Sequence, residues 1–106
     1  MYTVTTQFDR PNKNIPYYID TNLELKTEFF YFIEDHHKLI IEVTTVELSN
    51  LSQITTVVYP DAEAFDKFIV EFNRHFPTFF MDRDAYCEEN NIIITRSIAQ
   101  RVILDF

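Results

Sequence analysis

The chain has 106 residues and contains no glycine. Glycine adopts positive φ angles without a steric penalty and lets the backbone approach a phosphate group closely. Phosphate-binding loops, the dinucleotide fingerprint, the nucleophile elbow and the calcium-binding EF-hand all need glycine at defined positions. These motifs are therefore excluded. The turns must use Asn, Asp and Ser, which tolerate the left-handed region better than most residues.

The chain is rich in residues that build a hydrophobic core, since 46% of it is hydrophobic and 16% is aromatic. Disordered segments have few aromatic and branched aliphatic residues, and 106 residues is a common size for one domain. We therefore expect a single compact α+β domain over residues 1–106. No apolar run approaches the ~20 residues of a membrane-spanning helix, so we expect no membrane association.

Three features of the sequence bear on cellular location. Residues 1–6 lack the basic and apolar stretches of a secretory signal. Cys87 is the one cysteine, which excludes a disulfide within the chain and is typical of a reducing compartment. The absence of Gly beside many Asn, Ile, Phe and Tyr residues is typical of AT-rich coding sequences, as in bacteriophages and low-GC bacteria. We expect a cytoplasmic protein, in the host cytoplasm if a phage encodes it.

Seventeen acidic residues against nine basic residues give a net charge of −8. This charge disfavours direct binding to DNA or RNA, because contacts to phosphates dominate that affinity. A basic surface on another protein is a better partner for such a chain. The same charge can also serve solubility alone.

The clearest element is an amphipathic helix over 61–76. Asp61 is its expected N-cap and Pro77 follows its end. Aromatic and aliphatic residues recur along it at helical spacing: Phe65, Phe68, Ile69, Phe72 and Phe76. The fold class that we predict is α+β, an antiparallel sheet of about four to six strands with this one main helix packed on one face.

Alternating apolar residues predict the strands of that sheet. The first strand is expected at 2–8, followed by a loop at 9–16. A hairpin of strands at 23–34 and 39–48, with its turn at 35–38, leads to a further strand at 54–59. Toward the C-terminus the pattern predicts short strands at 78–81 and 92–95, and it favours a helix over a strand at 97–106.

The predicted hairpin supplies the candidate interface. A two-residue turn at His36 and His37 would bring one apolar cluster together near the tip, with carboxylates on the same face toward the base. The apolar residues are Phe30, Phe32, Ile41 and Val43, and the acids are Glu24, Glu28 and Glu47. The C-terminal segment could cover this cluster, or the cluster could remain uncovered as an interface for a partner or a second copy.

Few residues suggest chemistry. Two carboxylates at alternate positions, Asp82 and Asp84, followed by Glu88 and Glu89, could hold a hard divalent cation, but a solvated turn explains them better. Adjacent histidines at a turn point in different directions, so a zinc site at His36 and His37 is not expected. We expect no metal site, no cofactor and no catalytic residues, and therefore no enzyme.

The leading functional hypothesis is a non-enzymatic acidic binding protein that occupies a basic surface of another protein, as a phage- or bacterial-type inhibitor or modulator. One alternative is a self-associating structural or assembly subunit that pairs through the hairpin. A second alternative is a small metal-dependent enzyme that uses the cluster of Asp82, Asp84, Glu88 and Glu89.

Overall fold

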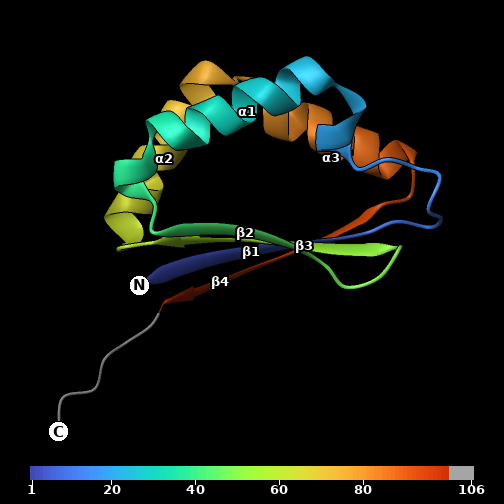
Figure 1. The fold of residues 1–106 in the computed structure, drawn as a ribbon, viewed down its shortest axis with the longest axis horizontal. Helices are drawn as coiled ribbons and strands as arrows, with labels where there is room; N and C mark the ends of the chain where they lie inside the picture. Colours follow the sequence, from blue (N-terminus) through green and yellow to red (C-terminus); the bar gives the residue numbers. More distant parts are fainter. Residues whose placement is uncertain (101–106) are drawn as a thin grey trace, which may run out of the picture.

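The computed structural model describes residues 1–100, which form two layers: an antiparallel sheet, and helices that all lie on one side of it (Figure 1). The main elements along the chain are β1 (Tyr2–Asp9), α1 (Leu23–Asp35), β2 (Glu42–Glu47), β3 (Ser52–Tyr59), α2 (Ala62–His75), α3 (Phe79–Glu89) and β4 (Ile93–Gln100). Two short 3₁₀ turns, η1 (Tyr18–Thr21) and η2 (His37–Leu39), flank α1. The fold is thus α+β, with four strands and three α-helices among the described residues.

The four strands follow the order β2-β3-β1-β4, and every neighbouring pair is antiparallel. In the centre of the sheet Val4 pairs with Val57 on β3 and with Ile98 on β4. Side chains alternate between the two faces of a strand, and directly opposed residues share a face. Val4 is buried in the core and Val57 packs against it, so this row faces the helices.

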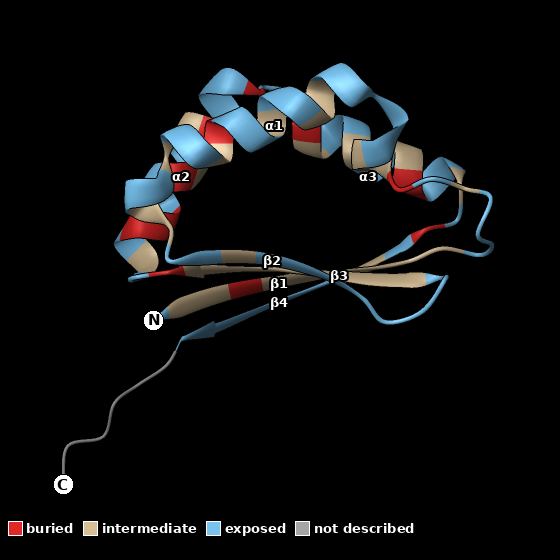
Figure 2. Cartoon of the chain, viewed as in Figure 1, coloured by how far each residue is buried: buried red, intermediate tan, exposed pale blue. Residues whose placement is uncertain are grey.

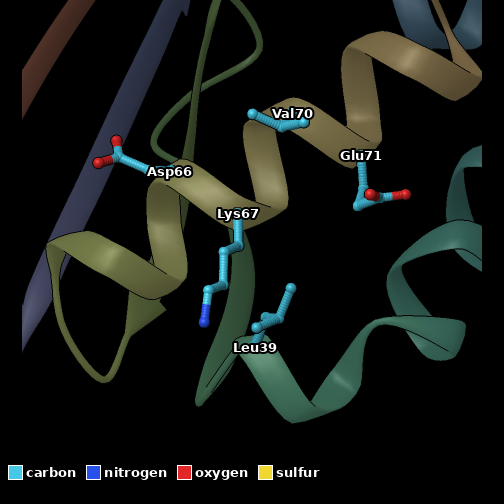
Figure 3. Close-up of a pocket in the computed structure, with 5 residues that line it drawn as sticks. All are labelled: Leu39, Asp66, Lys67, Val70 and Glu71. Carbon is cyan, nitrogen blue, oxygen red and sulfur yellow. The ribbon is translucent and has the colours of Figure 1, made fainter.

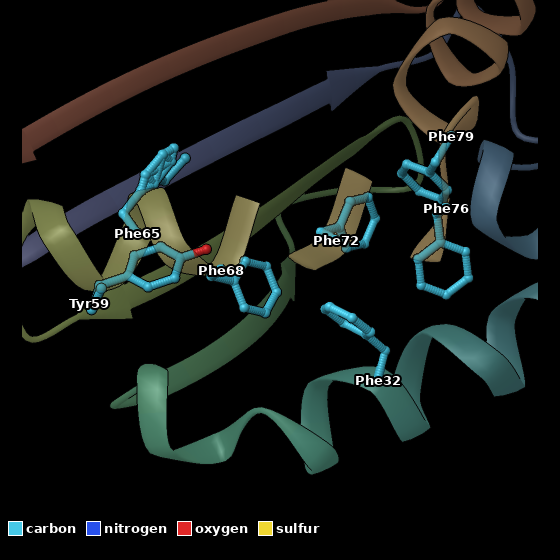
Figure 4. Packing of buried hydrophobic residues seen from close by; sticks show 9 residues of the cluster. Phe32, Tyr59, Phe65, Phe68, Phe72, Phe76 and Phe79 are labelled. Carbon is cyan, nitrogen blue, oxygen red and sulfur yellow. The ribbon is translucent and has the colours of Figure 1, made fainter. Parts of the chain in front are cut away.

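Most of the buried core lies within the helical layer and at its contact with the sheet (Figures 2 and 4). Phe72 on α2 is only 2% exposed, and Phe32 on α1 is 5% exposed. Their ring centroids lie 5.5 Å apart in an edge-to-face arrangement, which is a favourable geometry for aromatic pairs. The helical layer meets the sheet through Phe65, whose ring lies 5.0 Å from that of Tyr2 on β1.

The predicted helix over 61–76 is confirmed as α2. Asp61 is its N-cap and accepts a hydrogen bond from the backbone N–H of Ala64 at 2.8 Å. Phe65, Phe68 and Phe72 are buried along one face, as the spacing predicts. Glu63 in the first turn and Arg74 in the last match the helix dipole.

The turn after α3 shows how the chain manages without glycine. Asn91 has φ of 58°, the one positive value among the described residues. Its N–H donates to the carbonyl of Glu88, and the N–H of Ile92 donates to that of Cys87 at 2.8 Å. These two bonds make a Schellman motif, in which glycine is the usual left-handed residue and Asn is the main substitute.

The predicted strand at 23–34 is wrong, because these residues form α1. The segment is so rich in apolar residues that it satisfies both the strand period and the helix period. The helix prevails because Leu25, Phe29 and Phe32 lie on one helical face and pack into the core. The side chain of Asn22 also caps the helix by accepting from the N–H of Leu25 at 3.1 Å. The predicted hairpin therefore does not exist, and β2 pairs with β3 instead.

The expectations for the C-terminal third are partly wrong. Residues 78–81 do not form a strand, since α3 begins at Phe79. The strand predicted at 92–95 is confirmed in β4, which continues to Gln100. The helix favoured at 97–106 is wrong for 97–100, which pair with β1, and residues 101–106 lie outside the described part of the chain. The predicted strands at 2–8 and 54–59 are confirmed in β1 and β3.

We expect Phe72→Ala to lower the free energy of unfolding by about 3–5 kcal/mol, because it leaves a cavity among well-packed rings. Val70→Ala is the matched control on the same helix, since Val70 is 55% exposed and should lose less than about 1 kcal/mol. Urea titrations of both variants test this. Equal midpoints for the two variants would show that the core is not centred on Phe72.

Candidate functional surfaces

The structure separates the four apolar residues of the predicted interface. Phe32 is in the core, whereas Phe30 on the same helix is 57% exposed. Ile41 is 53% exposed just before β2, and Val43 is half-buried on the helix-facing side of that strand. The predicted cluster fails because it depends on a hairpin register that a helix at 23–35 cannot have.

The three acids of the same prediction are also separated. Glu24 and Glu28 are exposed on α1, while Glu47 ends β2. Their role in binding a basic partner stays a prediction.

The four residues of the predicted metal cluster lie on α3, and two of their carboxylates are engaged locally. Asp82 accepts from the hydroxyl of Thr78 at 2.9 Å, and Asp84 accepts from Arg83 at 3.0 Å. Within residues 1–100 no group of three or more His, Cys, Asp or Glu side chains could hold a metal ion. Cys87 on the same helix is buried, and burial raises the pKa of its thiol, which makes it a poor nucleophile.

The net charge is confined to the helical layer. The segments 18–39 and 61–89, which contain all three α-helices, hold thirteen acidic and five basic residues. This imbalance equals the whole net charge of −8, because the rest of the chain has four of each sign. The sequence shows the charge, and the fold places it on one side of the molecule.

The face of the sheet that points away from the helices carries no α-helix of the described chain (Figure 1). We call it the open face. It is made of alternate residues of the four strands in register: Thr3, Thr5, Gln7, Asp9, Glu42, Thr44, Val46, Ser52, Ile54, Thr56, Val58, Ile93, Thr95, Ser97 and Ala99.

The open face is almost free of charge. Asp9 and Glu42 are its two carboxylates, and both lie at its margin. Asp9 is also engaged, since it accepts from the hydroxyl of Ser52 at 2.7 Å and from Gln7 Nε2 at 3.1 Å. None of the fifteen residues is buried. The open face is therefore a large neutral surface of hydroxyl and aliphatic side chains.

Two of the hollows in the described part of the chain lie on the helical layer. The first has a volume of about 410 Å³ and is lined by Leu39, Asp66, Lys67, Val70 and Glu71 (Figure 3). The ammonium group that lines it, Nζ of Lys67, forms an ion pair with Oε1 of Glu63 at 3.2 Å. In Figure 3 the carboxylates of Asp66 and Glu71 lie on opposite sides of the hollow, so its polar groups do not converge on one point.

The second hollow lies where α1 and α2 end, and we call it the terminal groove. It has a volume of about 340 Å³ and is lined by Glu28, Tyr31, Phe32, Asp35, His36 and His75. The imidazole of His36 stacks on the ring of Phe32, with a distance of 4.0 Å between the ring centroids. This groove gathers carboxylates, imidazoles and aromatic rings in one place.

Tyr17 is a further candidate that sequence reasoning missed. Its ring lies 6.4 Å from that of Phe8, which is on the helix-facing side of β1. The residue is 7% exposed, and its hydroxyl has no hydrogen-bond partner among the described residues. Burial raises the pKa of this hydroxyl, while the guanidinium of Arg10, 4.4 Å from the ring centroid, acts in the opposite direction. No spacing or motif around Tyr17 signals this environment in the sequence.

Comparisons with solved structures show that this is a ferredoxin-like α+β fold. A dimeric ferredoxin-like protein from an uncultured marine organism aligns with a TM-score of 0.67 and 12% identity, over 100% of this chain and 98% of that one. An antibiotic biosynthesis monooxygenase aligns with a TM-score of 0.59 and 20% identity, over 97% and 100%. SnoaB, a cofactor-independent oxygenase from Streptomyces nogalater, aligns with a TM-score of 0.55 and 10% identity, over 97% and 94%.

No protein-family model matches the chain, and no curated protein sequence matches it. At these identities the similarity to solved structures establishes the fold alone. Among residues 1–100 no helix is long and apolar enough to cross a membrane.

The prediction that the chain is not an enzyme is contradicted by these neighbours, two of which are oxygenases. That prediction rests on the missing motifs that bind phosphates and nucleotide cofactors, and a cofactor-independent oxygenase needs none of them. The absence of glycine therefore excludes particular motifs but does not exclude catalysis on this fold.

Proposed function

We propose that the protein acts as a homodimer in which the open faces of two copies pack against each other. The observation that carries this proposal is the near absence of charge on the open face of a chain whose net charge is −8. Two such chains repel each other through their helical layers. Packing of the open faces places those layers on opposite outer sides, where separation and salt weaken the repulsion most.

The chemistry of the open face suits such a contact. Its central row is Thr5, Thr44, Thr56 and Ser97, whose cross-strand pairing places small hydroxyl side chains side by side. Aliphatic side chains such as Ile54 and Val46 lie in the next row. Sheets pack face to face about 10 Å apart when small and branched side chains interdigitate. A two-fold dimer uses the same patch on both copies, and one structural neighbour is named as dimeric.

Thr56→Arg tests the dimer, because it places a cation near the centre of the open face. Two such cations would meet in a symmetric interface, and we expect the dissociation constant to rise at least about 100-fold. Thr27→Arg is the matched control, since Thr27 is exposed on α1. Light scattering after gel filtration, across a dilution series, gives the mass of each variant.

Two results would contradict the proposed dimer. One is a wild-type protein that remains a monomer at the highest concentration of the series. The other is a Thr56→Arg variant that stays dimeric, which would place the interface elsewhere on the molecule.

A second candidate function is cofactor-independent oxygenation of a small aromatic molecule, which we propose from the environment of Tyr17. Its hydroxyl is buried and has no hydrogen-bond partner among the described residues, while its ring lies 6.4 Å from that of Phe8 and 4.4 Å from the guanidinium carbon of Arg10. A buried hydroxyl without a partner is costly, and a polar ligand group would satisfy it. The names of two structural neighbours support oxygenase chemistry.

Oxygen consumption with a panel of electron-rich phenols, in the absence of added cofactor, tests this candidate. We expect Tyr17→Phe to lower the rate at least about tenfold by removing the polar contact. The variant should melt at or above the wild-type temperature, because the hydroxyl has no partner to lose. Uptake that never exceeds the buffer rate, or that is unchanged in Tyr17→Phe, would contradict oxygenation of this substrate class at Tyr17.

A further inference from the structure

The terminal groove is used by neither function proposed above. It lies in the helical layer, on the side of the molecule opposite the open face. It combines a hollow of about 340 Å³ with two carboxylates, of Glu28 and Asp35, that come from successive parts of α1. Both side chains belong to exposed residues, so the groove is accessible to another molecule.

The backbone adds to the negative potential of the groove. α1 ends at Asp35 and α2 ends at His75, and both residues line the groove. A helix C-terminus carries a partial negative charge from its last carbonyl groups, which favours cations nearby. The last residues of both helices therefore line the same hollow as the carboxylate of Glu28.

The imidazole of His36 contributes an acceptor. Its Nδ1 lies 2.8 Å from the backbone carbonyl of Phe32. A carbonyl oxygen only accepts, so Nδ1 carries the hydrogen and donates it. In the neutral ring Nε2 is then left as an acceptor. A ligand that donates several hydrogen bonds fits these groups better than one that accepts them.

The remaining wall of the groove is aromatic. Tyr31 is 62% exposed, which is unusual for so large a side chain, and Phe32 forms a buried floor. Aromatic faces attract cations, and a flat guanidinium group also stacks on them. Acidic and aromatic groups thus line the same hollow.

We propose that the terminal groove binds the guanidinium group of an arginine side chain presented by a basic segment of another protein. A planar guanidinium pairs with carboxylates such as those of Glu28 and Asp35 through its fork of donors, and it stacks on aromatic faces such as that of Tyr31. A lysine side chain has the same positive charge, but its ammonium group is not planar and cannot stack on an aromatic ring in the same way. The net charge of −8, all of it in the helical layer, draws a basic segment to this side of the molecule.

The test uses the full chain labelled with ¹⁵N and a synthetic peptide, Gly-Arg-Gly-Arg-Gly, with its lysine and citrulline counterparts as probes. Amide shifts on titration with the arginine peptide should map to the ends of α1 and α2. We expect the lysine peptide to bind more weakly and the citrulline peptide, which lacks the charge, to cause no saturable shift.

Charge-neutralising variants locate the site. Glu28→Gln and Asp35→Asn should each weaken binding about threefold to tenfold, the range expected for loss of one charged contact at a partly exposed site. Glu88→Gln is the matched control, because it removes one exposed carboxylate from α3. Tyr31→Leu keeps an apolar side chain but removes the ring, and it should reduce the preference for arginine over lysine.

Four outcomes would overturn the proposal. Equal weakening by all three charge variants would mean that the peptide responds to net charge alone. Saturable binding of the citrulline peptide would remove the role of the cation. Amide shifts that map outside α1 and α2, or no shifts at millimolar peptide, would show that the groove is not the site.

Discussion

The ring of Phe72 lies within 5.0–6.1 Å of six other aromatic rings. Two of these rings, those of Phe29 and Phe32, belong to α1, and two more, those of Phe79 and Phe80, belong to α3. Phe72 itself is on α2, so one side chain joins all three helices. The helical layer is a unit because of this cluster, and the placement of the surface charge follows from it.

When the aromatic side chains of three helices point inward, their charged side chains must point outward. The acids of the helical segments therefore collect on one side of the molecule. The rest of the sequence, outside residues 18–39 and 61–89, has equal numbers of acidic and basic residues. This separation leaves two surfaces with different chemistry. The open face suits a second copy of the chain, and the acidic side with the terminal groove suits a cation.

The sequence predicts correctly those elements whose hydrophobic pattern fits only a helix or only a strand. α2 has a capping Asp61 and a single apolar stripe, and β1 and β3 alternate clearly, so these elements could be predicted. α1 could not, because an almost continuous apolar run fits either period, although Asn22 was available as a capping signal. α3 has scattered charges and no side-chain cap, so nothing local marks its start. Its position depends on tertiary contacts of Phe79 and Cys87.

The candidate surfaces depended on these same elements. A strand at 23–34 would place Glu24 and Glu28 on a face of the sheet, whereas the helix α1 places them in the helical layer. The composition of the open face depends on the register of all four strands, which the sequence pattern of a single strand does not determine. Tyr17 and the terminal groove arise from contacts between segments distant in the sequence, which no local pattern encodes.

We propose that the net charge and the self-associating surface lie on opposite sides of the molecule. Sedimentation velocity of the wild-type chain in low salt and in 1 M sodium chloride tests it most directly. A dimer that packs through a neutral open face should persist in high salt, and should tighten as screening reduces the repulsion between two chains of charge −8. Dissociation of the dimer in high salt would show that ion pairs hold it together, and a monomer under both conditions would show that the open face does not self-associate.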